Sequence, residues 1–431
     1  MAMGSSWLAL GGVVVALLLT GCGSPSVEQS SSLSSGAPVA YTTPPRAAAP
    51  IQAKGDPVDP SSTFKLVTAL QGFGLDLLRA EAKAQPEGNI VLSPASIHDA
   101  LSMTANGASG QTAKEMLHAL RLDALGLPKA DSAWAWLIAS AEGNPDAEVR
   151  IANSLWLRKG VAFRPDFLKT NRDYFAADAA PLPDDPAGGA SQINDWVAER
   201  TGGRIQDLVG PIDPSTRLVL VNALYVKAGW DHFKTGDTKE GPFNLSDGQQ
   251  VQVPMMHGQI GTNVTETSDY VAVPIEANGE LSVTIVLPKS GRSPESVLPA
   301  LANGGLEDLS SDMKSKPYIV DLALPRFSAR FKDTELASSL EAMGMRRAFT
   351  PSAQFDGIAP GPLWIDQVVH EAVLDLNEQG VEAAAGTAVI MAGAAPPTEH
   401  LRVTVDRPFI VLLSTGSTDV PLFMAIVRDP R

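Results

Sequence analysis

The sequence predicts an α+β protein whose sheets are large and mostly antiparallel. The chain has 431 residues, 44% of them apolar and 19% charged, which is ordinary for a globular protein and enough for a large core. Apolar residues recur at helical spacing in the front half, most clearly from 64 to 83. Continuous apolar runs characteristic of sheet cores follow in the back half, beginning at 217–227. Helices followed by strands, instead of a regular alternation of the two, favour the α+β class.

The chain begins with an apolar run at residues 7–20, WLALGGVVVALLLT, which is short for a membrane span and typical of a signal-peptide core. It leads into Leu19-Thr20-Gly21-Cys22, which resembles the lipobox of bacterial lipoproteins. That resemblance implies that residues 1–21 are removed and that Cys22 is diacylated, which suffices for stable membrane anchoring. The stretch MAMGSS departs from the pattern because it lacks Lys and Arg. A plain signal peptide or a buried helix with an incidental cysteine are the alternatives.

The expected location is the cell envelope. Serine at position 24 favours the outer membrane or cell surface if enterobacterial sorting rules apply, and secretion is the alternative. Residues 23–62 are rich in Ser, Pro, Ala and Gly, so with Cys22 they form a predicted flexible tether over 22–62. The folded domain is then expected over 63–431.

Within that domain, the first predicted helix covers 64–83 and could be capped by Ser62 or Thr63. A second helix opens at Ser93-Pro94, with serine as the N-cap and proline at the first helical position. A shorter helix covers 193–200 and ends at two glycines. The predicted strands are at 217–227, 281–287, 401–413 and 421–427, the last two joined by the turn residues STGSTD.

Composition and motifs exclude several classes of function. The net charge of −15 is spread along the chain without a basic stripe, so nucleic acid is not an expected partner. A single cysteine rules out an internal disulfide framework and a multi-thiolate metal site. The six histidines lack metal-ligand spacing, and nucleotide-binding and hydrolase motifs are missing. We therefore expect no catalytic residues, metal or cofactor, which argues against a lipoprotein enzyme.

The run EQGVEAAAGTAV, from Glu378 to Val389, is composed almost entirely of small residues. In an extended conformation, Val381 and every second residue to Val389 share one uncharged face, and Glu382 falls on the other. Such a segment could enter a crowded sheet with little steric clash. It is therefore predicted to be a moving part that becomes a buried strand.

The chain resembles the serpin family over essentially the whole folded domain. The resemblance rests on eight motifs in family order: NIVLSPASIHDALSMTANGASGQTAKEM (89–116), INDWVAERTGGRIQDLV (193–209), TRLVLVNALYVKAGW (216–230), VPMM (253–256), LPRF (324–327), LEAMGM (340–345), NEQGVEAAAGTAV (377–389), and VTVDRPFIVLL (403–413) with PLFMAIV (421–427). It implies a large central sheet, additional sheets, a helix-rich N-terminal half and a mobile reactive-centre loop.

The resemblance also implies a mechanism. In the family, the loop is offered to a serine or, in some cases, cysteine endopeptidase, and the cleaved loop inserts into the central sheet. This insertion traps the covalent acyl-enzyme. The expected partner is thus a target protease, held covalently by a monomeric inhibitor. A non-inhibitory serpin acting as a surface binding protein is the alternative.

The resemblance assigns the hinge and the scissile bond residue by residue. The hinge comprises Glu378, Gly380, Val381, Glu382, Ala383, Ala384, Ala385, Gly386 and Thr387, with Val381 where the family more usually has Thr. Counting the family's usual span from Glu378 places the cleaved bond between Ala394 and Ala395, and nearby alternatives are Ile390, Met391, Ala392 and Gly393. Pro396-Pro397 could shift cleavage toward Met391. Because every candidate is uncharged, elastase-like or subtilisin-like targets are favoured over trypsin-like ones.

The resemblance further implies a hydrogen-bonded region beneath the sheet, at the place where its strands part. Its expected members are Ser93, Ser96, Asn222 and His370. Trp230 matches the tryptophan under the entrance of the loop, with ordinary core packing as the alternative.

Overall fold

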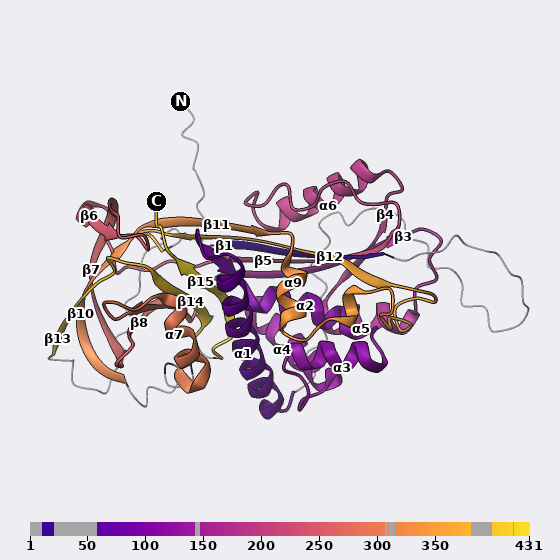
Figure 1. The fold of residues 1–431 in the computed structure, drawn as a ribbon, viewed down its shortest axis with the longest axis horizontal. Helices are drawn as coiled ribbons and strands as arrows, with labels where there is room; N and C mark the ends of the chain where they lie inside the picture. The colour runs from indigo at the N-terminus through magenta and orange to yellow at the C-terminus, as the bar shows by residue number, and fades with distance from the viewer. Residues whose placement is uncertain are drawn as a thin grey trace, which may run out of the picture.

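The computed structural model describes residues 11–20, 58–142, 147–306, 309, 315–380, 399–416 and 418–431. These residues form two sheets with helices packed around them (Figure 1). The α+β class is confirmed, and so is the mostly antiparallel pairing. Within this part of the chain, parallel neighbours occur at only two places, one in each sheet.

The central sheet has six strands in the described part of the chain. Their order across the sheet is β11 (Phe327–Asp333), β12 (Trp364–Leu376), β1 (Gly11–Thr20), β5 (Thr216–Lys227), β3 (Glu148–Arg158) and β4 (Asp178–Leu182). The predicted strand at 217–227 is thus β5. The N-terminal run, expected to form a signal-peptide core, lies as β1 between β12 and β5 in the full chain, where Figure 1 shows it in indigo.

The second sheet lies at the other end of the molecule (Figure 1). Its order is β13 (His400–Thr404), β10 (Ser315–Pro325), β7 (Gln250–Glu266), β8 (Tyr270–Ala277), β9 (Leu281–Pro288), β14 (Phe409–Thr415), β15 (Pro421–Val427) and β2 (Ile90–Leu92), and β6 (Lys239–Asn244) pairs with β7. The single strand expected at 401–413 is wrong. The run divides into β13, which pairs with β10, and β14, which pairs with β9 and β15. Pro408 lies between the two strands and has no backbone N–H to donate to a sheet.

Helices cover both faces of the central sheet. Below it in Figure 1 lie α1 (Pro60–Ala84), α2 (Pro94–Ala105), α3 (Gly110–Ala119), α4 (Leu127–Glu142), α5 (Pro165–Phe175) and α9 (Leu336–Ala342), and above it lies α6 (Pro186–Arg200). The helix α7 (Pro294–Ala300) packs beside the second sheet. No helix in the described ranges is long and apolar enough to cross a membrane.

Helix starts follow capping side chains. Ser93 caps α2 as predicted, because its Oγ accepts from the backbone of Ser96 at 3.1 Å. The predicted cap of the first helix at Ser62 or Thr63 is wrong, since α1 begins at Pro60 and Asp59 accepts from the Ser61 backbone. The helix α6 is also longer than predicted: Asp185 caps it and Pro186 opens it, a start signal that the apolar spacing at 193–200 does not contain.

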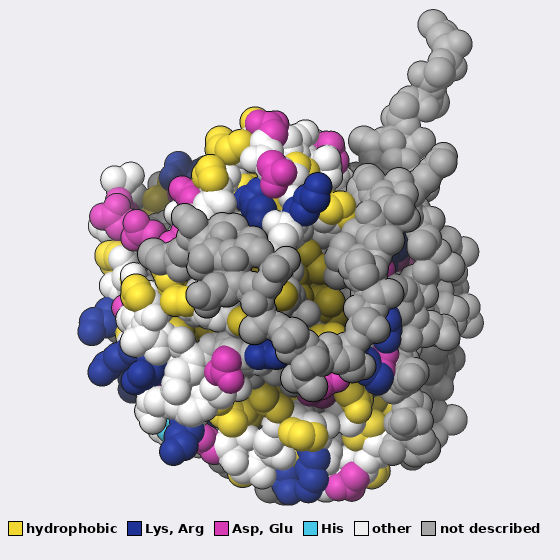
Figure 2. Space-filling view, turned by 90° about the vertical axis from the view of Figure 1, so that its right-hand side faces the viewer, with side chains coloured by type: hydrophobic (Ala, Val, Ile, Leu, Met, Phe, Trp, Pro, Cys, Tyr) yellow, Lys and Arg dark blue, Asp and Glu magenta, His cyan; other side chains and the backbone are white. Residues whose placement is uncertain are grey.

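Figure 2 looks at the end of the molecule on the right of Figure 1. Lysine and arginine side chains are interspersed with aspartate and glutamate over the described surface of this face. The view therefore agrees with the sequence, in which the acidic excess is dispersed and no basic stripe occurs.

Candidate functional site

The candidate site is the position in the central sheet between β12 and β5, which β1 fills. Val15 of β1 lies opposite His370 of β12 on one side and Asn222 of β5 on the other. On the far side of β5, Asn222 faces Asn153 of β3. On its outer side His370 lies opposite Asp333 of β11. One transverse row of the sheet thus carries Asp333, His370, Val15, Asn222 and Asn153, and four of these five residues are polar.

Asn222 is the centre of a buried hydrogen-bond cluster. Its amide nitrogen donates to Asp99 Oδ2 at 2.6 Å and to Asn153 Oδ1 at 2.9 Å, and its Oδ1 accepts from the Ser96 hydroxyl. Ser96 is in turn held by the cap at Ser93. The structure therefore brings together three residues that the family resemblance implied: Ser93, Ser96 and Asn222.

Sequence reasoning missed Asp99 and Asn153. Asp99 follows Ser96 by three positions, so both side chains lie on the face of α2 that meets β5. Asn153 interrupts the apolar run of β3 as Asn222 interrupts that of β5, and an isolated amide in a buried strand is a usable signal for a polar cluster. Burial raises the pKa of Asp99 to about 7, although hydrogen bonds from Asn153 and Asn222 oppose the shift.

His370 stands on the other side of β1, apart from this cluster. Its side chain is fully buried, and neither ring nitrogen has a hydrogen-bond partner among the described residues. Burial lowers the pKa of His370 to about 3, and the nearby Val91 backbone opposes the shift. The imidazole is therefore neutral at physiological pH, and its nearest ring neighbour is Phe331, with centroids 6.5 Å apart.

At one end of this position the chain leaves β12 through a tight turn at 377–380. The Trp230 indole donates to the Asn377 carbonyl at 3.0 Å, and Gly380 pairs with Gly229 in an isolated bridge. Gly380 has φ +64°, and a Cβ there would lie 2.6 Å from the Trp230 backbone nitrogen. Trp230 thus lies beside the start of the predicted hinge and is also buried in the core.

Glu378 anchors the same turn. Its side chain is buried, its Oε1 accepts from the Thr238 hydroxyl at 2.6 Å, and Arg326 Nη1 lies 3.5 Å from the same oxygen. Arg326 belongs to the LPRF motif, but its contact with Glu378 could not be read from either motif alone. The turn is thus fixed by side chains from two other segments of the chain.

The remaining predicted site residues lie outside the described residues. These are Cys22, the hinge residues Val381, Glu382, Ala383, Ala384, Ala385, Gly386 and Thr387, and the reactive-bond candidates Ile390, Met391, Ala392, Gly393, Ala394 and Ala395. Among the described residues, no group of three or more His, Cys, Asp or Glu side chains is arranged to hold a metal ion.

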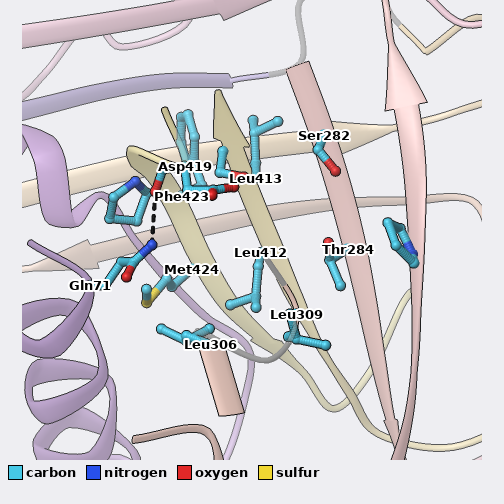
Figure 3. A pocket seen from close by; sticks show the side chains of 13 residues that line it. Gln71, Ser282, Thr284, Leu306, Leu309, Leu412, Leu413, Asp419, Phe423 and Met424 are labelled. Atoms are coloured by element: carbon cyan, nitrogen blue, oxygen red, sulfur yellow. Dashed lines mark hydrogen bonds between the residues drawn. The ribbon is translucent and has the colours of Figure 1, made fainter. Parts of the chain in front are cut away.

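Two cavities lie outside the position between β12 and β5, and the second is lined in part by Val149 and Ile151 of β3. The first, of about 80 Å³, is shown in Figure 3; there Gln71 of α1 reaches across to donate to the Asp419 carbonyl at 3.1 Å. The second, of about 270 Å³, is lined by apolar side chains that include Trp134 and Trp136. Both are smaller than the roughly 300–1,000 Å³ typical of small-molecule sites.

Comparison with known proteins agrees with this architecture. The family model described as "Serpin (serine protease inhibitor)" matches residues 68–430. An uncharacterized serpin-like protein of Thermococcus kodakarensis is 36% identical over 380 residues, which cover 85% of this chain and 86% of that protein.

Solved structures give the same result. The thermophilic serpin tengpin in its native state has a TM-score of 0.75 at 25% identity, covering 88% of this chain and 96% of that one. The complex of thyroxine-binding globulin with thyroxine has a TM-score of 0.75 at 27% identity. The match covers 85% of this chain and 100% of the globulin chain.

Proposed function

Since the chain belongs to the serpin family, we propose that it is an irreversible, suicide-substrate inhibitor of serine endopeptidases. Cysteine endopeptidases are a further class of target, because they also pass through an acyl-enzyme. The nucleophile attacks the carbonyl carbon of the residue before the scissile bond, Ala394 in our assignment. The peptide bond to Ala395 breaks, the new amine leaves, and an ester, or a thioester with cysteine, joins the protease to the inhibitor.

The inhibitory step is insertion of the cleaved loop between β12 and β5. Inserting the loop carries the attached protease along the sheet and distorts its catalytic site. Loss of the oxyanion hole and triad geometry slows hydrolysis of the ester by orders of magnitude. The inhibitor needs no catalytic group of its own, in keeping with a sequence that lacks nucleotide-binding and hydrolase motifs.

One observation carries this proposal: the central sheet accommodates a complete strand between β12 and β5. β1 pairs along its length with both neighbours, so their separation matches that of a regular antiparallel sheet. The turn that leaves β12 is anchored by Glu378 and Trp230 at the end of this same position. A segment that follows Gly380 therefore starts where an inserting strand must begin.

The candidate reactive-bond residues set the class of target. From Ile390 to Ala395 they are small or apolar and uncharged. A specificity pocket that binds Lys or Arg through a buried carboxylate has no partner in such a loop. We therefore propose elastase-like or subtilisin-like proteases as targets.

We also propose that the mature protein is a monomeric lipoprotein of the cell envelope, anchored through Cys22 in the outer membrane or at the cell surface. The LTGC box and the Ser-, Pro- and Gly-rich stretch after it support this location. The anchor would keep the inhibitor near proteases that reach the envelope.

The test uses protein exported by expressing cells, with its N-terminus read by mass spectrometry. Incubation with elastase or subtilisin should give a complex that survives boiling in SDS, while trypsin should give none. Mass spectrometry of the released peptide should place the cut between residues 390 and 395. Cleavage of the loop by every protease without a stable complex would contradict the proposal.

A non-inhibitory binding protein remains the second candidate, because thyroxine-binding globulin, crystallised with its ligand, shares the fold. The cavity volumes of about 80 and 270 Å³ give it little support. The SDS-stable complex separates the two functions, since a binding protein forms none.

A further inference from the structure

The N-terminal apolar run occupies the sheet position that the proposed mechanism requires to be free. β1 has ten residues, from Gly11 to Thr20, and pairs antiparallel with β12 and with β5. Gly11 lies opposite Leu374 and Val226, and Thr20 lies opposite Trp364 and Thr216. The strand therefore spans nearly the whole length of both neighbours.

Both faces of β1 are buried. Val15, Leu17 and Leu19 belong to the core beneath the sheet, where α1 and α2 pack. Val14, Ala16 and Leu18 belong to the core above it, with Trp196 of α6. From Val14 to Leu19, no residue is more than 7% exposed, so the run is packed as a core strand on both sides.

The direction of β1 matters as much as its position. β1 starts beside the end of β12 and runs back toward its beginning. A segment that turned back along β12 after Gly380 would run in the same direction over the same partners. Because each backbone group of β12 and β5 can pair with only one strand there, the two occupants exclude each other.

We propose that the position between β12 and β5 is a binding site for the chain's own N-terminal apolar run, and that its occupancy keeps the unprocessed chain from inhibiting proteases. The consequence for inhibition rests on the proposed function. Removal of residues 1–21, the predicted signal peptide, vacates the site. The inhibitor is thereby activated by the same cut that releases it from its leader.

Side-chain chemistry explains why the run holds the site. β1 supplies valines and leucines, whereas the hinge supplies mainly alanine and glycine. Valine and leucine bury more apolar surface than alanine, and valine also favours strands. The run and the hinge belong to the same chain, so both compete intramolecularly, and the larger apolar area that the run buries favours the run. The smaller hinge is therefore not expected to displace it.

The test compares the full chain, made without export and with its N-terminus intact, with the exported, processed protein. The full chain should be cut in the loop by elastase but yield at least tenfold less SDS-stable complex than the exported form. In the full chain, Val15→Asp with Leu17→Asp should restore complex formation. Both side chains face the core beneath the sheet, and burying two carboxylates there would cost more than the strand gains by pairing. Val15→Ile with Leu17→Val, which conserves total volume, should behave as the unmodified full chain.

Hydrogen exchange reads site occupancy independently of inhibition and of how well the aspartate variant folds. Amides 11–20 of the full chain should exchange at least a hundredfold more slowly than those of the serine-rich stretch at 30–37. Fast exchange of amides 11–20 overturns the inference, whatever the result with the proteases. Equal complex yield from full chain and exported form also overturns it, and leaves the proposed function standing. If the exported form also gives no SDS-stable complex, the proposed function is wrong, and the proposed activation by signal-peptide removal is wrong with it. Slow exchange of amides 11–20 would still support the binding site between β12 and β5.

Discussion

His370 and Asn222 lie in the same transverse row of the central sheet and are separated by Val15 of β1. Asn222 is fully engaged with Ser96, Asp99 and Asn153, whereas the imidazole has no hydrogen-bond partner among the described residues. β1 separates the two residues, and Asp333 of β11 lies opposite His370 on the other side. In a sheet without β1, the same register would bring His370 and Asn222 opposite each other.

Asn222→Ala should destabilise the protein by about 2–4 kcal/mol, because Asp99, Asn153 and Ser96 each lose a buried partner. The measurement is denaturant unfolding. Asn303→Ala, at an exposed position, is the matched control and should change stability by no more than about 0.5 kcal/mol. Similar values for the two variants would contradict the cluster.

His370 should make stability fall with acidification. Its pKa is 6.5 when unfolded and about 3 when buried, so the unfolded chain alone binds the proton between these values. Stability from the neutral imidazole is complete above pH 6.5 and falls by about 1.4 kcal/mol per pH unit below it. His370→Gln removes this slope. Unfolding free energies of both proteins from pH 7.5 to 4.5 should therefore converge, and parallel curves would show that His370 is not buried in neutral form.

Ala385→Arg should convert the processed inhibitor into a substrate. The residue falls on the uncharged face of the hinge, and an arginine there would have to be buried without a partner on insertion. Loop cleavage should continue while the SDS-stable complex is lost. Ala385→Val keeps that face apolar and should still inhibit. An arginine variant that inhibits as fast as the parent would show that the inward face is assigned wrongly.

Loop cleavage should raise the melting temperature of the processed protein, the opposite of what nicking does to most proteins. Insertion of about a dozen residues at ~3.3 Å each adds a strand of roughly 40 Å to the sheet. Thermal melts before and after cleavage by a non-target protease measure the difference. An unchanged or lower melting temperature in the processed protein would refute insertion.

Cys22 should carry the lipid. Cells grown with a fatty-acid analogue should label the wild-type protein and leave Cys22→Ala unlabelled, because the Cys22 thiol is the proposed attachment site of the lipid. Equal labelling of both proteins would exclude lipidation at this cysteine.

Elements whose signals are local could be predicted from the amino-acid sequence alone. Helical spacing at 64–83 identified α1, the Ser93-Pro94 pair identified the start of α2, and the apolar run at 217–227 identified β5. The order of motifs identified the family. These signals survive folding because they depend on neighbours a few residues away. The start of α6 also has a local signal, the pair Asp185-Pro186, but the apolar spacing at 193–200 does not include these residues.

The occupant of the position between β12 and β5 could not be predicted from local signals and is evident only in the folded chain. The run at 11–20 is apolar on every position from Val13 to Leu19, a pattern shared by signal-peptide cores and by strands buried on both faces. Its pairing partners are far away in the chain, so periodicity carries no information about them. The same holds for Asn222 and its partners Asp99 and Asn153, and for Glu378 with Thr238. Each is an ordinary polar residue until folding removes it from water and requires a hydrogen-bond partner.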